Sequence, residues 1–145
     1  MRLWHEDLIP YLDNKRLLSQ HRECCALRGK GWGRKHSVVD YVFKYDLAHL
    51  YAYHLLVMHE MVCRNYHVDG SWYGRLYRGS KLPRSTLLEC GTYVQRFCGD
   101  HVYAEHDDKY LKECLLLLKE KGACLVNGKS IEQWLIDIDL SKDSV

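Results

Sequence analysis

The chain has 145 residues, 47% of them hydrophobic and 28% charged, and a formal net charge of +2. This composition is typical of a folded globular protein and excludes disordered and collagen-like chains. No apolar run approaches the roughly 18 residues of a membrane span, which excludes integral membrane proteins, and the length suits a single domain over residues 1–145 with one core.

The beginning of the chain, residues 1–13, precedes the first predicted helix. Glu6 and Asp7 stand where a signal peptide would have its apolar region. We therefore expect a cytoplasmic protein. The seven cysteines are then expected to be free thiols, because the cytosol is reducing and an odd number cannot all pair.

The first predicted helix covers residues 14–27. Its apolar residues recur at a spacing that gives the helix one buried side. Asp13 or Asn14 can cap its beginning, and Gly29 ends it. This helix carries a carboxylate, Glu23, close behind the basic residues of the run Gln20-His21-Arg22.

A basic, glycine-rich loop follows this helix. Four cations fall within eight residues that contain no acid, at Arg28, Lys30, Arg34 and Lys35. A polyanion responds to such a local concentration of charge more than to the net charge of the chain. Residues 38–43 are rich in β-branched and aromatic side chains, a composition compatible with either a short strand or a packed linker.

A long second helix is predicted over residues 46–66, where apolar side chains keep a helical spacing. Asn65 can take the left-handed conformation at its end. Residues 67–104 are polar, aromatic and basic, and we expect a loop with one short helix near 86–97.

Aromatic and basic side chains alternate in this loop. The aromatic residues Trp72, Tyr73 and Tyr77 interleave with the arginines Arg75, Arg78 and Arg84. Such a segment suits stacking on an extruded base and gripping of a nucleic-acid backbone. An aromatic cluster packed beneath a long loop accounts for the same pattern equally well, and both interpretations stay open at this point.

The last third of the chain predicts two more helices, over residues 107–121 and about 131–138. Asp107 and Asp108 suit the beginning of the first, and Gly122 ends it. Asn127-Gly128 is a tight turn between the two. The predicted fold class is therefore all-α: a compact single-domain bundle of three main helices plus short helices.

Several of these residues together make the chain resemble the pyrimidine-dimer DNA glycosylases, the endonuclease-V type of UV-repair enzyme. The start Met-Arg-Leu-Trp is similar to that of a bacterial branch of this family. The matching residues are Leu8, Leu12, Leu17, the pair Arg22-Glu23, the run Arg34-Lys35-His36 and the helix end Cys63-Arg64-Asn65-Tyr66. The resemblance is good over residues 1–66 and loose over the helix at 107–121.

The resemblance implies a DNA glycosylase with AP lyase activity, in which the N-terminal segment packs between the helices. An α-amine at the chain start attacks C1′ of the damaged nucleotide, an imine forms, and β-elimination then cuts the strand. Glu23 falls on the family glutamate and is expected to serve as the acid/base group, because a carboxylate stabilises a positive imine and moves protons. We assign the amine to Met1; a chain processed to begin at Arg2 is the alternative.

The resemblance and the basic loops also predict a DNA-binding surface. Its expected members are His21, Arg22, Arg28, Arg34, Lys35, His36, Arg75 and Arg78. The expected partner is damaged double-stranded DNA. We expect the protein to act as a monomer that binds neither a membrane nor a small-molecule cofactor. Two other classes stay open: a catalytically lapsed nucleic-acid-binding module on the same scaffold, and an interaction protein without a nucleic-acid role.

A metal site is not expected from the sequence. Cys90, Cys98, His101 and His106 are the best candidate set, but their spacing is not that of a zinc finger. A proton-transfer mechanism that uses an amine and a carboxylate needs no metal and no cofactor. The lesion stays open among pyrimidine dimers, oxidised pyrimidines and abasic sites.

Overall fold

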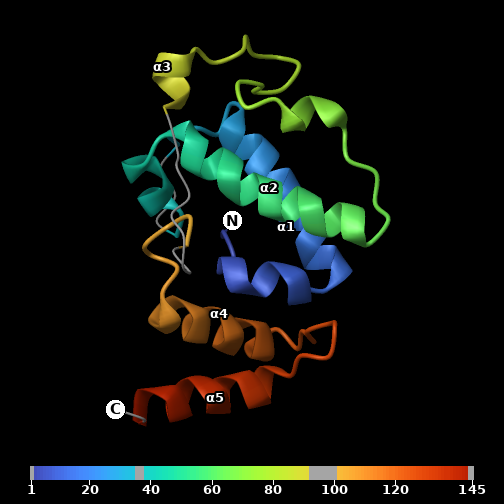
Figure 1. Cartoon of the computed structure of the whole chain (residues 1–145), viewed down its shortest axis with the longest axis vertical. Coiled ribbons are helices and arrows are strands. Elements are labelled where there is room, and N and C mark those ends of the chain that lie inside the picture. Colours follow the sequence, from blue (N-terminus) through green and yellow to red (C-terminus); the bar gives the residue numbers. More distant parts are fainter. Residues whose placement is uncertain (1, 35–37, 92–100, 144–145) are drawn as a thin grey trace.

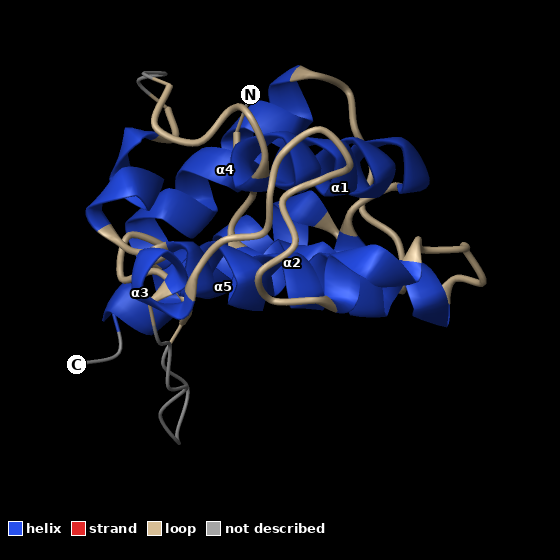
Figure 2. Cartoon of the chain, turned by 90° about the horizontal axis from the view of Figure 1, so that it is seen from above, coloured by secondary structure: helices blue, strands red, loops and turns tan. Residues whose placement is uncertain are grey.

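The structure is a computed structural model that describes residues 2–34, 38–91 and 101–143. Every regular element among these residues is a helix (Figure 2). The α-helices are α1 Asn14–Arg28, α2 Leu47–Cys63, α3 Leu87–Cys90, α4 Asp108–Glu120 and α5 Ile131–Asp143. The 3-10 helices are η1 Glu6–Tyr11, η2 Asp40–Lys44 and η3 Gly70–Tyr73. The predicted all-α fold is confirmed.

The long helices are arranged in two pairs (Figure 1). α1 packs against α2, and α4 packs antiparallel to α5. The N-terminal segment and η1 lie between the two pairs, where Leu3 is completely buried and Trp4 is 8% exposed. The expectation that the N-terminal segment packs between helices is therefore confirmed.

The core consists of the apolar sides of these helices. The buried positions of α2 include Leu50, Tyr53 and Val57, which follow one another at the three- and four-residue spacing of one helix side. α4 contributes Leu115 and Leu118 at the same kind of spacing. Each such side chain stabilises the fold by roughly 1.5–3 kcal/mol through burial. Within the described residues, no helix is both long enough and apolar enough to traverse a lipid bilayer.

The β-prone run at residues 38–43 does not form a strand. The run continues into the 3-10 helix η2, at the beginning of which Val42 N–H donates to Val39 O at 3.0 Å. Val39 and Val42 are both completely buried. The strand alternative is wrong and the packed-linker alternative is right, because these apolar side chains are used for packing and have no neighbouring strand among the described residues with which to pair.

The other predicted elements agree with the structure except at some ends. Asn65 has a φ of 65°, the left-handed conformation expected at the end of α2. The short helix predicted near 86–97 is α3, and residues 92–100 lie outside the described residues. The last helix continues to Asp143, five residues beyond the predicted end, because no helix-breaking residue follows Ile138.

The loop after α1 folds back onto the end of that helix. Gly31 N–H bonds to Ala26 O at 2.8 Å, and a Cβ atom on Gly31 would lie only 2.7 Å from the same oxygen. Trp32 then packs edge-on against Phe43 at 5.1 Å between ring centroids. This loop is therefore a closely packed turn that requires glycine at position 31.

Candidate active site

The beginning of the chain lies directly against Glu23. The main-chain N–H of Arg2 donates to Glu23 Oε2 at 3.2 Å. Glu23 is half-buried on α1, three residues after the completely enclosed Gln20. The two side chains share one helix side because residues three apart are neighbours on an α-helix. A carboxylate and the first residues of the chain, 21 positions apart, are thus brought together.

Gln20 connects the two groups through its side-chain amide, which is 1% exposed. Its Nε2 donates to Glu23 Oε2 at 3.2 Å and to Arg2 O at 3.0 Å. Its Oε1 accepts from Trp4 N–H at 2.7 Å and lies 3.1 Å from the Tyr53 hydroxyl oxygen. The amide therefore bonds to the chain on both sides of Leu3.

Two tyrosines hold the same segment from other helices. Tyr53 of α2 donates to Trp4 O at 2.5 Å, and Tyr110 of α4 donates to Leu3 O at 2.6 Å. Burial raises the pKa of both phenols well above the usual value, so both stay protonated donors. The chain start is consequently fixed by α1, α2 and α4 at once.

A second polar group lies on another side of α1, where His21, His54 and Arg28 form a chain. Arg28 Nη1 lies 2.9 Å from His54 Nδ1, and His54 Nε2 lies 2.8 Å from His21 Nδ1. A guanidinium can only donate, so Nδ1 of His54 accepts and its Nε2 carries the proton that it donates to His21. Burial and the Arg28 charge lower the pKa of His54 well below its usual value, which agrees with this neutral form.

Arg28 is enclosed by the loop after η3. Its guanidinium donates to Trp72 O and Gly74 O at 2.8 Å each and to Tyr77 O at 3.1 Å. It is 2% exposed, so the charge predicted to contact DNA is turned inward and organises the loop. This is possible because α1 continues through Arg28 before Gly29 ends it.

Arg78 makes the reciprocal connection. Its Nε donates to Arg28 O at 2.9 Å and its Nη2 to Gly29 O at 3.1 Å. The two basic stretches of the sequence, 28–35 and 75–84, are therefore bound to each other. Between them lies an open pocket of about 410 Å³, whose lining includes Lys30, Trp72, Tyr77, Arg78 and Lys81.

The remaining predicted DNA contacts divide into two groups. Arg22, Arg34 and Arg75 are exposed on the surface. Lys35 and His36 lie outside the described residues, as does Met1, which is predicted to supply the catalytic amine. Of the two interpretations of the aromatic loop, the packed cluster describes Trp72 well, because its ring lies 4.9 Å from that of Tyr77 and 5.0 Å from the guanidinium carbon of Arg28.

Two groups of side chains in the described residues lie close enough to share a metal ion. The first group consists of His21, Cys25 and His54. The proton on His54 Nε2 occupies the lone pair that a metal would bind. Burial raises the pKa of the Cys25 thiol to about 11, which disfavours the thiolate that binds metals. The second group consists of His5, Asp7 and His101, and in it His5 Nδ1 accepts a hydrogen bond from Asp7 N–H at 3.1 Å. Two of the three ligand atoms of the first set therefore carry a proton, whereas His5 Nε2 in the second set is buried without a hydrogen-bond partner among the described residues. Of the zinc set weighed from the sequence, Cys98 lies outside the described residues.

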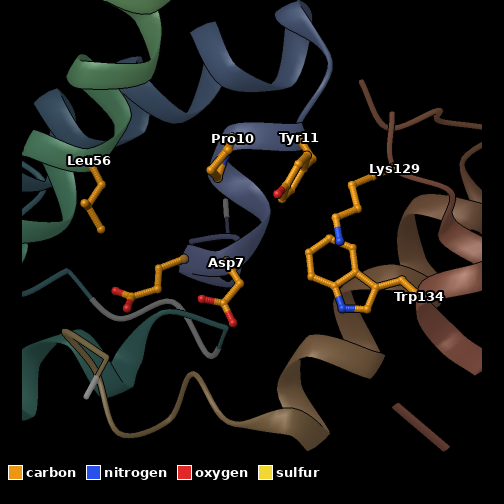
Figure 3. A pocket seen from close by; sticks show the side chains of 7 residues that line it. Asp7, Pro10, Tyr11, Leu56, Lys129 and Trp134 are labelled. Atoms are coloured by element: carbon orange, nitrogen blue, oxygen red, sulfur yellow. The ribbon is translucent and has the colours of Figure 1, made fainter. Parts of the chain in front are cut away.

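A second pocket of about 420 Å³ lies beside η1, and its lining does not include Glu23 (Figure 3). Asp7 faces it from one side and Lys129 from the other, with the Lys129 ammonium 4.8 Å from the centre of the Trp134 ring and 5.2 Å from that of Tyr11. Glu6 adds a second carboxylate to the lining. This acidic surface is unfavourable for a polyanion.

Three residues that contact the candidate site residues or the chain start were not expected from the sequence: Gln20, Tyr53 and His54. Gln20 is three residues before Glu23, and that spacing alone was a usable signal. Tyr53 and His54 had no such signal, because their roles depend on the packing of α2 against α1.

Comparison with known proteins gives one match. A family model described as pyrimidine dimer DNA glycosylase matches residues 1–74, which is just over half of the chain. The matched part contains α1 and α2, and with them Glu23, Gln20 and Tyr53. No curated protein and no solved structure matches the chain.

Proposed function

This chain belongs to the pyrimidine dimer DNA glycosylase family, a family of DNA repair glycosylases that bind damaged DNA, and we propose that it reacts through an imine between its own N-terminal amine and the damaged nucleotide. Glu23 is the acid/base group of this mechanism. Cleavage of the glycosidic bond is followed by β-elimination, which gives AP lyase activity.

The observation that supports this proposal is the 3.2 Å distance between the Arg2 main-chain nitrogen and Glu23 Oε2. If Met1 is removed, that nitrogen is the α-amine. If Met1 is retained, the α-amine belongs to the residue before Arg2, and the Cα atoms of consecutive residues are about 3.8 Å apart. In either case the chain start supplies an amine whose unperturbed pKa is roughly 7.7–8.0, so that part of it is neutral and nucleophilic near pH 7.

The chemistry follows from this pairing. The neutral amine donates its lone pair to C1′ of the deoxyribose as the bond from C1′ to the base breaks and its electrons leave with the base. Loss of a proton from nitrogen and opening of the sugar ring give the imine. Glu23 stabilises the positive charge of the protonated imine and accepts the C2′ proton as the bond from C3′ to oxygen breaks.

Exposed cations supply the DNA surface in this proposal. Arg22 directly precedes Glu23 on α1, and Arg34 and Arg75 are exposed on the two loops that Arg28 and Arg78 join. Contacts of this kind go to phosphates and position the duplex. The pocket of about 410 Å³ adds Lys30, Arg78 and Lys81 to these cations, together with the carboxylate of Asp69.

Borohydride trapping on DNA that contains a single abasic site tests the mechanism. We expect the wild-type protein to form a covalent adduct and to cut the strand. Glu23→Gln keeps the shape of the side chain but removes the charge and the base, and we expect strand cutting to fall by at least about 100-fold.

Digestion and mass spectrometry of the trapped adduct identify the reacting residue. A modified N-terminal peptide that retains Met1 supports the assignment of the reacting amine to Met1. A modified peptide that begins at Arg2 supports a chain from which Met1 has been removed. Absence of any adduct, together with salt-sensitive DNA binding, contradicts the proposal in favour of a lapsed DNA-binding module.

A further inference from the structure

We propose that Gln20 is the positioning residue of this site: it holds Glu23 and the chain start in register so that carboxylate and amine meet. This inference rests on the proposed function. Gln20 is 1% exposed, so it acts through Glu23 and the chain start and not by contact with DNA.

The first argument is that the Gln20 amide uses three of its four hydrogen-bonding positions, including both N–H groups. A side-chain amide has two N–H donors and an oxygen with two lone pairs. Here both N–H groups have acceptors, Glu23 Oε2 and Arg2 O, and the oxygen has a donor, Trp4 N–H. A buried amide that is satisfied in this way has one low-energy orientation.

The second argument concerns which end of the amide faces Glu23. A flipped amide would point its NH₂ group at Trp4 N–H, donor against donor, and its oxygen at Glu23 Oε2 and Arg2 O, acceptor against acceptors. Tyr53 donates its one proton to Trp4 O at 2.5 Å and so holds the chain start beside the amide. The N–H groups are thereby directed at Glu23 and at the chain start.

The third argument concerns charge. Glu23 Oε2 receives both the Gln20 N–H and the Arg2 main-chain N–H. Two N–H donors directed at one carboxylate oxygen hold that oxygen where its negative charge can stabilise a developing imine. The same two bonds fix the distance between carboxylate and amine, and small displacements of reacting groups have large effects on rate.

The test compares Gln20→Glu and Gln20→Met with the wild type in single-turnover cutting of abasic DNA from pH 5 to pH 9. Gln20→Glu puts a second carboxylate beside Glu23, which favours the protonated forms of both the carboxylate pair and the amine. We expect its pH–rate profile to move to higher pH by about one unit. We expect Gln20→Met to react about tenfold more slowly, with DNA affinity unchanged within about twofold.

The chain offers a matched control in α5. Gln133 Nε2 donates to Asp137 Oδ1 at 2.9 Å, the same pairing of a glutamine with a carboxylate on one helix. Both side chains are exposed and far from Glu23 in sequence. Gln133→Glu should leave the rate and the pH profile at their wild-type values.

The outcomes separate two failures. If the wild type forms a borohydride adduct but the Gln20→Glu profile superimposes on it, Gln20 has only a structural role and the inference is overturned. If the wild type forms no adduct, the proposed function fails, and the positioning role in catalysis fails with it. To exclude a folding effect, rates are expressed per folded molecule, as measured by circular dichroism. Exchange of the Trp4 amide, which we expect to be about tenfold faster in Gln20→Met, reports the hold on the chain start directly.

Discussion

At the scale of the residue, arginines that look alike in the sequence have different environments in the fold. Arg28 is buried, with three carbonyl acceptors and a histidine nitrogen around its guanidinium. Arg75 is exposed on the loop that Arg28 organises. One is expected to matter for stability and the other for DNA binding.

Arg75→Ala should weaken DNA binding without changing the stability of the protein. Loss of one phosphate contact reduces the slope of log K against log salt concentration by about 0.9. Fluorescence anisotropy with a labelled duplex between 50 and 300 mM salt measures this slope. A slope equal to that of the wild type would remove Arg75 from the interface.

Arg28→Lys should have the opposite effect. A lysine keeps the charge but cannot serve several acceptors in the geometry of a guanidinium, and it leaves buried carbonyls without donors. We expect a loss of about 3 kcal/mol in the free energy of unfolding. Urea unfolding measures it. A stability within about 0.5 kcal/mol of the wild type would show that water replaces these bonds.

At the scale of the element, the turn after α1 decides where the basic loop lies. Gly31→Ala places a Cβ atom 2.7 Å from Ala26 O, and the main chain must move because the obstacle is itself main chain. We expect a loss of about 1–3 kcal/mol. Thermal unfolding measures the effect.

Gly70→Ala is the matched control for this turn. Gly70 begins η3, and a Cβ atom there meets nothing within 4 Å. The substitution reduces the freedom of the unfolded chain, so stability should be unchanged or higher by about 0.4–1 kcal/mol. Equal losses at both positions would contradict the steric argument at Gly31.

At the scale of the whole molecule, buried histidines make the fold sensitive to acid. Burial, with His5 and His101 nearby, lowers the pKa of His106 to about 3, and burial with Arg28 lowers that of His54. The unfolded chain takes up these protons near pH 6.5, whereas the folded chain does not. Stability is therefore complete above about pH 6.5 and decreases as the pH falls toward 3, by up to about 1.4 kcal/mol per pH unit for each such histidine.

His106→Gln should make this pH dependence less steep. His106 Nδ1 accepts Glu6 N–H at 3.2 Å, and its Nε2 lies 2.7 Å from the Tyr41 hydroxyl oxygen, so the variant is expected to be less stable at pH 7.5. Its loss of stability between pH 7.5 and 5 should nevertheless be smaller than that of the wild type. Urea unfolding at a series of pH values measures both. The control is His67→Gln, at an exposed histidine, which should show the same dependence of unfolding free energy on pH as the wild type.

The sequence by itself determined the helices, because their signals are local. Apolar spacing and terminal residues such as Asp107 and Gly122 act within a few residues of where they stand, and the structure has α4 between them. The local signal failed at residues 38–43, where side chains suited to a strand are used to fill the core as part of η2. Glu23 was found from the sequence only through its family resemblance.

Only the tertiary structure decided which residues meet. The contact of Arg2 with Glu23 depends on Gln20, Tyr53 and Tyr110, which come from three different helices. Two basic stretches about 50 residues apart are joined by Arg28 and Arg78. Contacts of this kind form because side chains from several helices pack closely into one core. The residue pattern of a single helix predicts which side is buried, but it does not predict which residues of other helices pack against that side.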